Sequence, residues 1–193
     1  MNSIKGTETE KNLLKSFAGE SQARMRYNYF ASKAKEEGFP VIASIFEETA
    51  NHEREHAKRF FKFLEGGMVN IETSFPAGKI GTTAENLLAS INGEHEEATD
   101  LYPVFAKKAR EEGFEAIAKV FENVAEAEKY HETRFKKLLD SLEAKTMFKL
   151  QGKKVVWKCT NCGFHTIAEE APLVCPACGH KQSYFIMVDE ELF

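Results

Sequence analysis

Apolar residues recur at helical spacing over most of the first 145 residues. The pattern predicts a long helix from Thr7 to Gly38, opened by a capping box of Thr7 and Glu10. A second helix is predicted from about Pro40 to the glycine pair at 66–67, next to the first and antiparallel to it. The two helices form one hairpin.

The connection over residues 66–81 contains further glycine and proline and is too long for a hairpin turn, so it is expected to cross the bundle. Thr82 and Glu85 then begin a third helix that runs to Gly113, and a fourth follows from about Glu115 to Lys145. The fold predicted for this part is a mainly α four-helix bundle with a long crossover between its second and third helices.

The two hairpins are an internal repeat. When the chain is shifted by 75 residues, positions 27–64 match positions 102–139 with 20 identities in 38 positions. Upstream, the Gly19-Glu20 pair matches Gly93-Glu94 at a shift of 74, so the third helix holds one extra residue before Tyr102. A helix absorbs such a residue as a π-bulge, a feature common at functional sites.

Composition narrows the class of protein. The chain has 193 residues, 42% hydrophobic and 29% charged, which suits one large globular domain and one small one. A net charge of −4 without a basic block argues against nucleic acid as a partner. No apolar run approaches the ~18 residues of a membrane span, and the polar start does not look like a signal peptide. We therefore expect a soluble cytoplasmic protein with no membrane partner.

Glutamate and histidine residues occur at matching places in the two halves. Each half has a Glu-x-x-His pair, whose side chains share one helical face, and a glutamate on its other helix. This is the ligand arrangement of ferritin-like di-iron and di-manganese bundles, and these ligands suit iron or manganese while leaving zinc open. The candidate metal ligands are Glu20, Glu53, His56, Glu94, Glu128 and His131.

Residues 52–56 also match the H-E-x-x-H signature of zinc metalloproteases. The repeat argues against a protease, because the residue equivalent to His52 is Ala127 whereas the Glu-x-x-His pair is retained. His52 is instead expected at the surface or just behind the metal ligands, and His95 is expected to face solvent.

Three more residues are candidates for the chemistry of this site. Glu97 lies one turn beyond Glu94, where the repeat slips by a residue, and is a candidate seventh ligand. Tyr27 and Tyr102 occupy equivalent positions, from which each hydroxyl could hydrogen-bond a metal-bound carboxylate. The alternative for both tyrosines is an ordinary core position with the hydroxyl bonded elsewhere.

Four cysteines form a second candidate site. They occur as two Cys-x-x-Cys-Gly knuckles twelve residues apart, which predicts a closed tetrahedral site for zinc or for a single iron. Sequence spacing does not separate these metals, and His165 and His180 are not needed as ligands. The cysteines are Cys159, Cys162, Cys175 and Cys178.

These motifs together closely resemble the rubrerythrin family over nearly the whole chain. The resemblance implies a ferritin-like di-iron domain over residues 1–147 and a small, β-rich rubredoxin-like Fe(Cys)4 domain over residues 153–193. It also implies a peroxidase that reduces hydrogen peroxide to water and protects against oxidative stress. The assignment of iron, rather than zinc, to the cysteine site rests on this resemblance.

Carried onto this chain, the family pattern makes Glu53 and Glu128 bridging ligands, with Glu20 and Glu94 terminal on opposite irons. His131 stays on one iron, while His56 and Glu97 exchange on the other with redox state. The resemblance further implies electrons from a rubredoxin or an NAD(P)H-dependent reductase. It also implies a homodimer, and a head-to-tail pairing would shorten the electron path because the last helix extends roughly 20 Å beyond His131.

Two other function classes stay open at this stage. A ferroxidase or iron-handling protein of the ferritin-like type would use the same bundle, although the cysteine module argues against it. A metal-stabilised binding protein with a zinc ribbon would be colourless. The lysines at 145, 149, 153 and 154 are a weaker candidate for docking an acidic redox partner.

Overall fold

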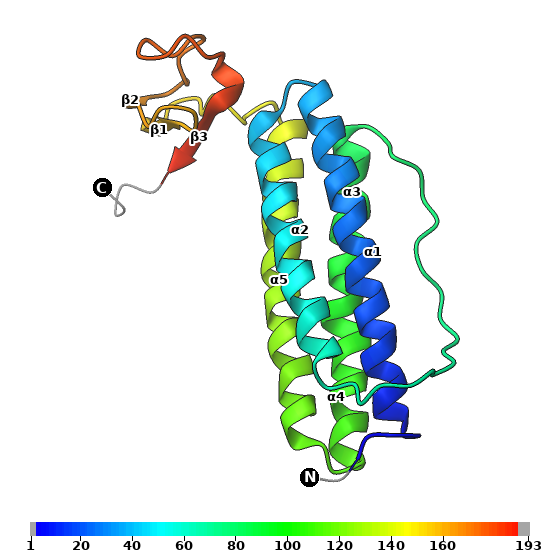
Figure 1. Ribbon diagram of the computed structural model, residues 1–193. Helices are drawn as coiled ribbons and strands as arrows, with labels where there is room; N and C mark the ends of the chain where they lie inside the picture. Colours follow the sequence, from blue (N-terminus) through cyan, green and yellow to red (C-terminus); the bar gives the residue numbers. More distant parts are fainter. Residues whose placement is uncertain (1–2, 189–193) are drawn as a thin grey trace.

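The computed structural model describes residues 3–188. Its helical part consists of α1 (Glu8–Glu36), α2 (Pro40–Phe61), α3 (Thr83–Glu96), η1 (Glu97–Leu101), α4 (Tyr102–Glu111) and α5 (Glu115–Glu143). Helix α1 packs along α2, and the continuous rod of α3, η1 and α4 packs along α5 (Figure 1). The predicted four-helix bundle is confirmed.

The two halves begin with different caps. Thr82 and Glu85, which the sequence predicts to begin the third helix, form a full capping box at α3. At α1 the Thr7 hydroxyl accepts from the Glu10 amide at 3.1 Å, but the Glu10 carboxylate accepts from Gly6 N at 2.8 Å instead of from Thr7. Thr7 N already donates to the Ile4 carbonyl, so only half of the predicted capping box forms.

The connection between α2 and α3 is the predicted crossover. It leaves the lower end of the bundle and runs as an extended strap outside α1 and α3 to the upper end (Figure 1). Gly66 and Gly67 have φ angles of +81° and +100°, and these left-handed conformations turn the chain out of α2. The strap lets both hairpins pack side by side.

The extra residue of the second half is accommodated as expected. Segment η1 is a π-helix that begins at Glu97 and lies between Glu94 and Tyr102. Helical hydrogen bonding resumes at once in α4, so the rod is not broken. The bulge changes the direction in which Glu97 points relative to its place in a regular helix.

Two apolar clusters fill the bundle, and the candidate ligands lie between them. One cluster contains Tyr27, Phe46 and Phe135, and the other contains Tyr102 and Phe121. Along α1, α2 and α5, residues of one cluster precede the ligand positions and residues of the other follow them. The carboxylates therefore occupy a polar layer closed at both ends by aromatic side chains.

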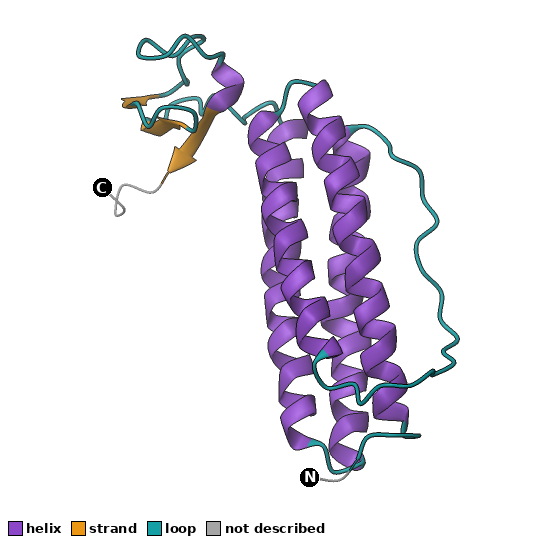
Figure 2. Cartoon of the chain, in the orientation of Figure 1, coloured by secondary structure: helices purple, strands orange, loops and turns teal. Residues whose placement is uncertain are grey.

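The small unit contains a three-stranded antiparallel sheet in the order β2-β1-β3 (Figure 2). Its elements are β1 (Val155–Cys159), β2 (His165–Ala168), the 3-10 turn η2 (Gln182–Tyr184) and β3 (Phe185–Val188). Trp157 of the central strand is buried and donates its indole N–H to the Ala168 carbonyl at 3.1 Å. Phe148 and Leu150 of the preceding segment also pack against this core.

The small unit lies at the end of the bundle where α1 turns into α2 (Figure 1). Ile186 and Met147 pack against the nearer bundle cluster. In the part of the chain that the structure describes, no helix combines the length and apolar character needed to cross a membrane.

Candidate metal centres

Four helices each contribute to the polar layer of the bundle. Glu20 comes from α1 and Glu94 from α3, while α2 and α5 each supply a Glu-x-x-His pair on one face. The ligand atoms fall into two overlapping groups, and within each group they lie within 4.8 Å of one another. The groups are Glu20, Glu53, His56 and Glu128, and Glu53, Glu94, Glu128 and His131.

The overlap fits two ions that share two carboxylates. Glu53 and Glu128 belong to both groups, so each can offer one oxygen to either ion. The histidine atom that faces each group is Nδ1. For His56 it lies 3.0 Å from both shared glutamates, and for His131 it lies 2.7 Å from Glu128 and 3.3 Å from Glu53.

Burial shows that this layer requires a cation. The four glutamates of the two groups are at most 1% exposed. Within residues 3–188, several of their oxygens accept no hydrogen bond: one each on Glu20, Glu53 and Glu94, and both on Glu128. Leaving several carboxylates buried and unpaired would cost many kcal/mol, and a pair of divalent or trivalent ions removes that cost.

Burial and the close spacing of the carboxylates also shift the pKa values of the candidate ligands. Burial, together with the charge of nearby glutamates, raises the pKa of Glu20 well above its ordinary value and that of Glu94 to about 8. Burial opposes the charge on Glu128, but the close approach of the His131 and His56 rings outweighs it and holds its pKa at about 2. Burial would lower the pKa of His131, yet the neighbouring carboxylates of Glu128, Glu53 and Glu94 raise it to about 12. Protons thus compensate charge at the positions that metal ions would take.

The two tyrosines connect the halves of the repeat. Tyr27 of the first half donates to Glu94 of the second, and Tyr102 of the second donates to Glu20 of the first. Burial and these carboxylates raise the pKa of both phenols well above the ordinary value, so each remains a donor. The hydrogen bonds hold the two non-shared carboxylates in place.

Glu97 lies beside the two groups but in neither of them. It opens η1, and its carboxylate approaches Gly19 of α1. Burial and the charges of Glu94 and Glu128 raise its pKa well above the ordinary value, and nearby Arg26 only partly offsets this. Glu97 therefore lies beside the six candidate ligands as a carboxyl group whose ionisation is disfavoured.

One contact behind the ligands is more specific than the sequence indicated. His52 Nδ1 lies 3.1 Å from His131 Nε2, and the two rings stack at 5.3 Å. Burial and the neighbouring His131 lower the pKa of His52, which favours a neutral ring that can accept a hydrogen bond. The counterpart of His52 in the repeat is Ala127, so His56 has no equivalent partner. His95 is exposed and bonded to Glu132 at 3.1 Å.

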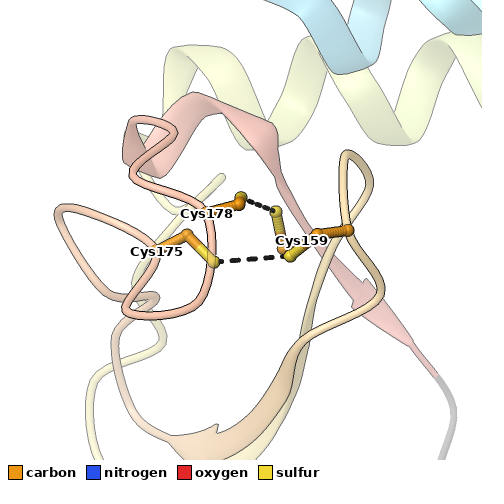
Figure 3. Close-up of side chains that lie close together, drawn as sticks. Cys159, Cys175 and Cys178 are labelled. Carbon is orange, nitrogen blue, oxygen red and sulfur yellow. Dashed lines mark hydrogen bonds between the residues drawn. The ribbon is translucent and has the colours of Figure 1, made fainter.

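The four cysteines come together where the central strand β1 ends at Cys159 (Figure 3). Cys159 Sγ lies 3.8 Å from Cys178 Sγ, and Cys162 Sγ lies 3.7 Å from Cys175 Sγ. Both separations far exceed a disulfide bond of about 2.05 Å. They match the ~3.8 Å edge of a tetrahedron whose metal–sulfur distance is about 2.3 Å.

The two knuckles are built alike. Gly163 N donates to the Cys159 carbonyl and Gly179 N to the Cys175 carbonyl, both at 2.9 Å. Each glycine has a positive φ, +80° and +74°, which closes the turn around the sulfurs. A backbone N–H at His180 lowers the pKa of Cys178 to about 6, which favours the thiolate form that binds metal. The site is a closed four-sulfur metal site.

The fold and the two ligand sets define a ferritin-like di-iron protein that carries a rubredoxin-type iron domain. Residues 11–139 match the family model described as rubrerythrin, and residues 157–186 match the one described as the rubrerythrin rubredoxin-like domain. The chain belongs to the rubrerythrin family, as its sequence motifs indicated.

Curated relatives and solved structures match this chain over nearly its whole length. Rubrerythrin of Porphyromonas gingivalis is 57% identical over 95% of this chain and 91% of its own, and that of Nitratidesulfovibrio vulgaris is 53% identical over 96% of each. A solved structure of nigerythrin in its all-ferrous state is 28% identical and covers 97% of this chain and 92% of its own, with a TM-score of 0.64. Family membership makes the protein an iron-dependent oxidoreductase whose rubredoxin-like domain exchanges electrons with a redox partner.

Proposed function

We propose that the protein is a peroxidase that reduces hydrogen peroxide to two molecules of water, consuming two electrons and two protons. The observation that carries the proposal is the pair of overlapping ligand groups in a chain that also holds a one-electron Fe(Cys)4 site. When bound, the two irons supply the two electrons that cleave the O–O bond. The Fe(Cys)4 site would then return electrons singly from an external donor.

The residues have distinct parts in this proposal. Glu53 and Glu128 would bridge the irons, Glu20 and Glu94 would be terminal ligands, and the four cysteines would hold the third iron. His131 would remain on one iron, while His56 and Glu97 would alternate on the other. The hydrogen bonds from Tyr27 and Tyr102 keep the terminal carboxylates oriented during this exchange.

Glu97 is the proposed proton donor. Its raised pKa keeps a proton on the carboxyl group when the group is not a ligand, and its place beside the cluster puts that proton near the reacting oxygen. General acid catalysis requires such a protonated group within hydrogen-bond reach of the leaving oxygen.

Several further features belong to the same proposal. We place the domain division at residues 1–147 and 153–193 and the protein in the cytoplasm, where unpaired thiols persist. A rubredoxin or an NAD(P)H-dependent reductase would supply the electrons. Two chains would pair head to tail, so that the Fe(Cys)4 site of one lies beside the di-iron site of the other.

Metal analysis and a peroxide titration test the proposal. Anaerobically purified protein should contain about three irons per chain, and the reduced form should be oxidised rapidly by stoichiometric hydrogen peroxide. With a reductant present, peroxide should be consumed continuously. Consumption of added Fe(II) without sustained peroxide turnover would instead show a ferroxidase, and a colourless zinc protein would show a structural role.

Glu97→Ala should retain iron but react with peroxide about 10²- to 10⁴-fold more slowly, because both the proton donor and the exchanging ligand are lost. Stopped-flow oxidation of the reduced protein measures this rate. Glu96→Ala is the matched control, since Glu96 is adjacent and exposed. Equal rates for the two variants would remove Glu97 from the mechanism.

A further inference from the structure

A cavity of about 280 Å³ lies on the crossover side of the di-iron site. Its walls include Gly19 and Arg26 of α1, Glu97 and Tyr102 of the other half, and Phe75 of the crossover strap. Glu97 and Tyr102 belong to the site, whereas the strap is at the surface (Figure 1). The cavity therefore connects the neighbourhood of the metal ligands with the outside of the bundle.

Gly19 brings the strap and the site close together. A Cβ atom placed on Gly19 would lie 3.6 Å from Phe75 Cε1 and 3.9 Å from Glu97 Oε1. Both atoms are thus within 4 Å of one point, so the ring edge and the carboxylate are less than 8 Å apart. Any side chain larger than methyl at position 19 would occupy the space between them.

The position of Phe75 would limit the size of a molecule that enters the cavity. Its side chain is 42% exposed, so one part faces solvent while its edge covers the gap above Gly19. The lining of the cavity also includes Arg26, whose buried Nε has no hydrogen-bond partner among residues 3–188.

We infer that this cavity is the entry route for the peroxide substrate, and that Phe75 over Gly19 restricts entry to small, polar hydroperoxides. The inference rests on the proposed peroxidase function and adds a substrate class to it. Hydrogen peroxide is little larger than water and can hydrogen-bond along a wall containing Arg26 and Glu97. A bulky apolar hydroperoxide gains no such bonds and meets the Phe75 ring.

The first test compares two oxidants on the iron-loaded, reduced full-length protein. In stopped-flow experiments, Phe75→Ala should raise the rate with cumene hydroperoxide at least about 10-fold, while the rate with hydrogen peroxide changes less than about twofold. Phe75→Trp should shift the ratio of the two rates in the opposite direction. Ile80→Ala is the matched control, because Ile80 is an exposed apolar residue of the same strap and lines a different cavity.

The second test does not depend on turnover. Removal of ferrous iron from the bundle by 2,2′-bipyridine, an aromatic chelator, should be faster in Phe75→Ala than in the native protein and unchanged in Ile80→Ala. Equal acceleration of both oxidants in Phe75→Ala would indicate general loosening and would overturn the inference. An unchanged rate ratio would do the same.

The two tests also separate this inference from the function on which it rests. If the native protein shows no reaction with either hydroperoxide but chelation is still faster in Phe75→Ala, the entry route stands and the peroxidase proposal fails. If hydrogen peroxide reacts rapidly and Phe75→Ala alters neither the rate ratio nor chelation, the peroxidase proposal stands and the entry route fails.

Discussion

At the scale of single residues, the two histidine ligand candidates differ in what lies behind them. His131 presents Nδ1 to the carboxylates and Nε2 to His52, whereas the position equivalent to His52 in the other half is Ala127. A second hydrogen bond fixes the tautomer and orientation of a ligand histidine. This difference explains why His131 would stay in place and His56 would be the histidine that leaves.

His52→Leu should lower the affinity of the bundle for iron by about 10- to 100-fold, because His131 loses the hydrogen-bond partner that orients its ring. Competition with a chelator under anaerobic conditions measures the affinity. His95→Leu is the control, since His95 is an exposed histidine whose ring is bonded to Glu132. Equal affinities of the two variants would show that the His52 contact is incidental.

At the scale of elements, each half of the repeat caps the other. Glu37, at the end of α1, accepts from Thr83 N at the start of α3 at 2.9 Å. Its counterpart Glu112, at the end of α4, accepts from Thr9 N at 2.9 Å and from the Thr9 hydroxyl at 2.6 Å at the start of α1. A carboxylate at a helix N-terminus satisfies free N–H groups and interacts favourably with the helix dipole.

Glu112→Gln should lower the free energy of unfolding by about 1 kcal/mol at neutral pH, as measured by urea denaturation. Burial raises the pKa of Glu112, but the hydrogen bonds from Thr9 and Glu8 outweigh it and lower the folded-state value. The stabilisation is therefore complete above the unfolded value of 4.5 and is lost as the pH falls through the folded pKa. Glu111→Gln, on the exposed neighbour, should show neither the loss nor the pH dependence; a matching loss there would contradict the capping role.

At the scale of the whole molecule, the two metal sites of one chain are far apart. The Cys178 knuckle lines a cavity together with Pro40, at the first turn of α2. Glu53 lies 13 residues further along the same helix, a distance of about 20 Å. Electron transfer within one chain would have to cross that length, which favours transfer between the chains of a head-to-tail dimer.

Co-expression of two inactive variants tests transfer between chains. Cys178→Ser lacks an intact Fe(Cys)4 site, and Glu53→Ala lacks an intact di-iron site. If electrons pass between partners, random mixing should restore about a quarter of the native peroxidase activity, because half of the dimers are mixed and each has one complete path. Activity no greater than that of the separate variants would refute transfer between chains.

The sequence by itself determined the bundle, the repeat and the identity of the residues that could bind metal. Helical periodicity and glycine punctuation are local properties, and duplication shows which polar residues were kept, so Glu53, His56 and their counterparts could be recognised without coordinates. The spacing of the cysteines was likewise sufficient to predict the four-sulfur metal site, because each Cys-x-x-Cys-Gly knuckle is a local turn.

Only the tertiary structure decided the contacts between segments distant in the chain. The crossed tyrosine bonds, the His52–His131 pair, the mutual capping by Glu37 and Glu112 and the position of Phe75 over Gly19 each join different helices or the strap. Periodicity assigns a residue to a face of its own helix, but the side chain it meets depends on helix packing and on the path of the crossover. Those two features of the fold settle how the site is supported and how it opens to the outside.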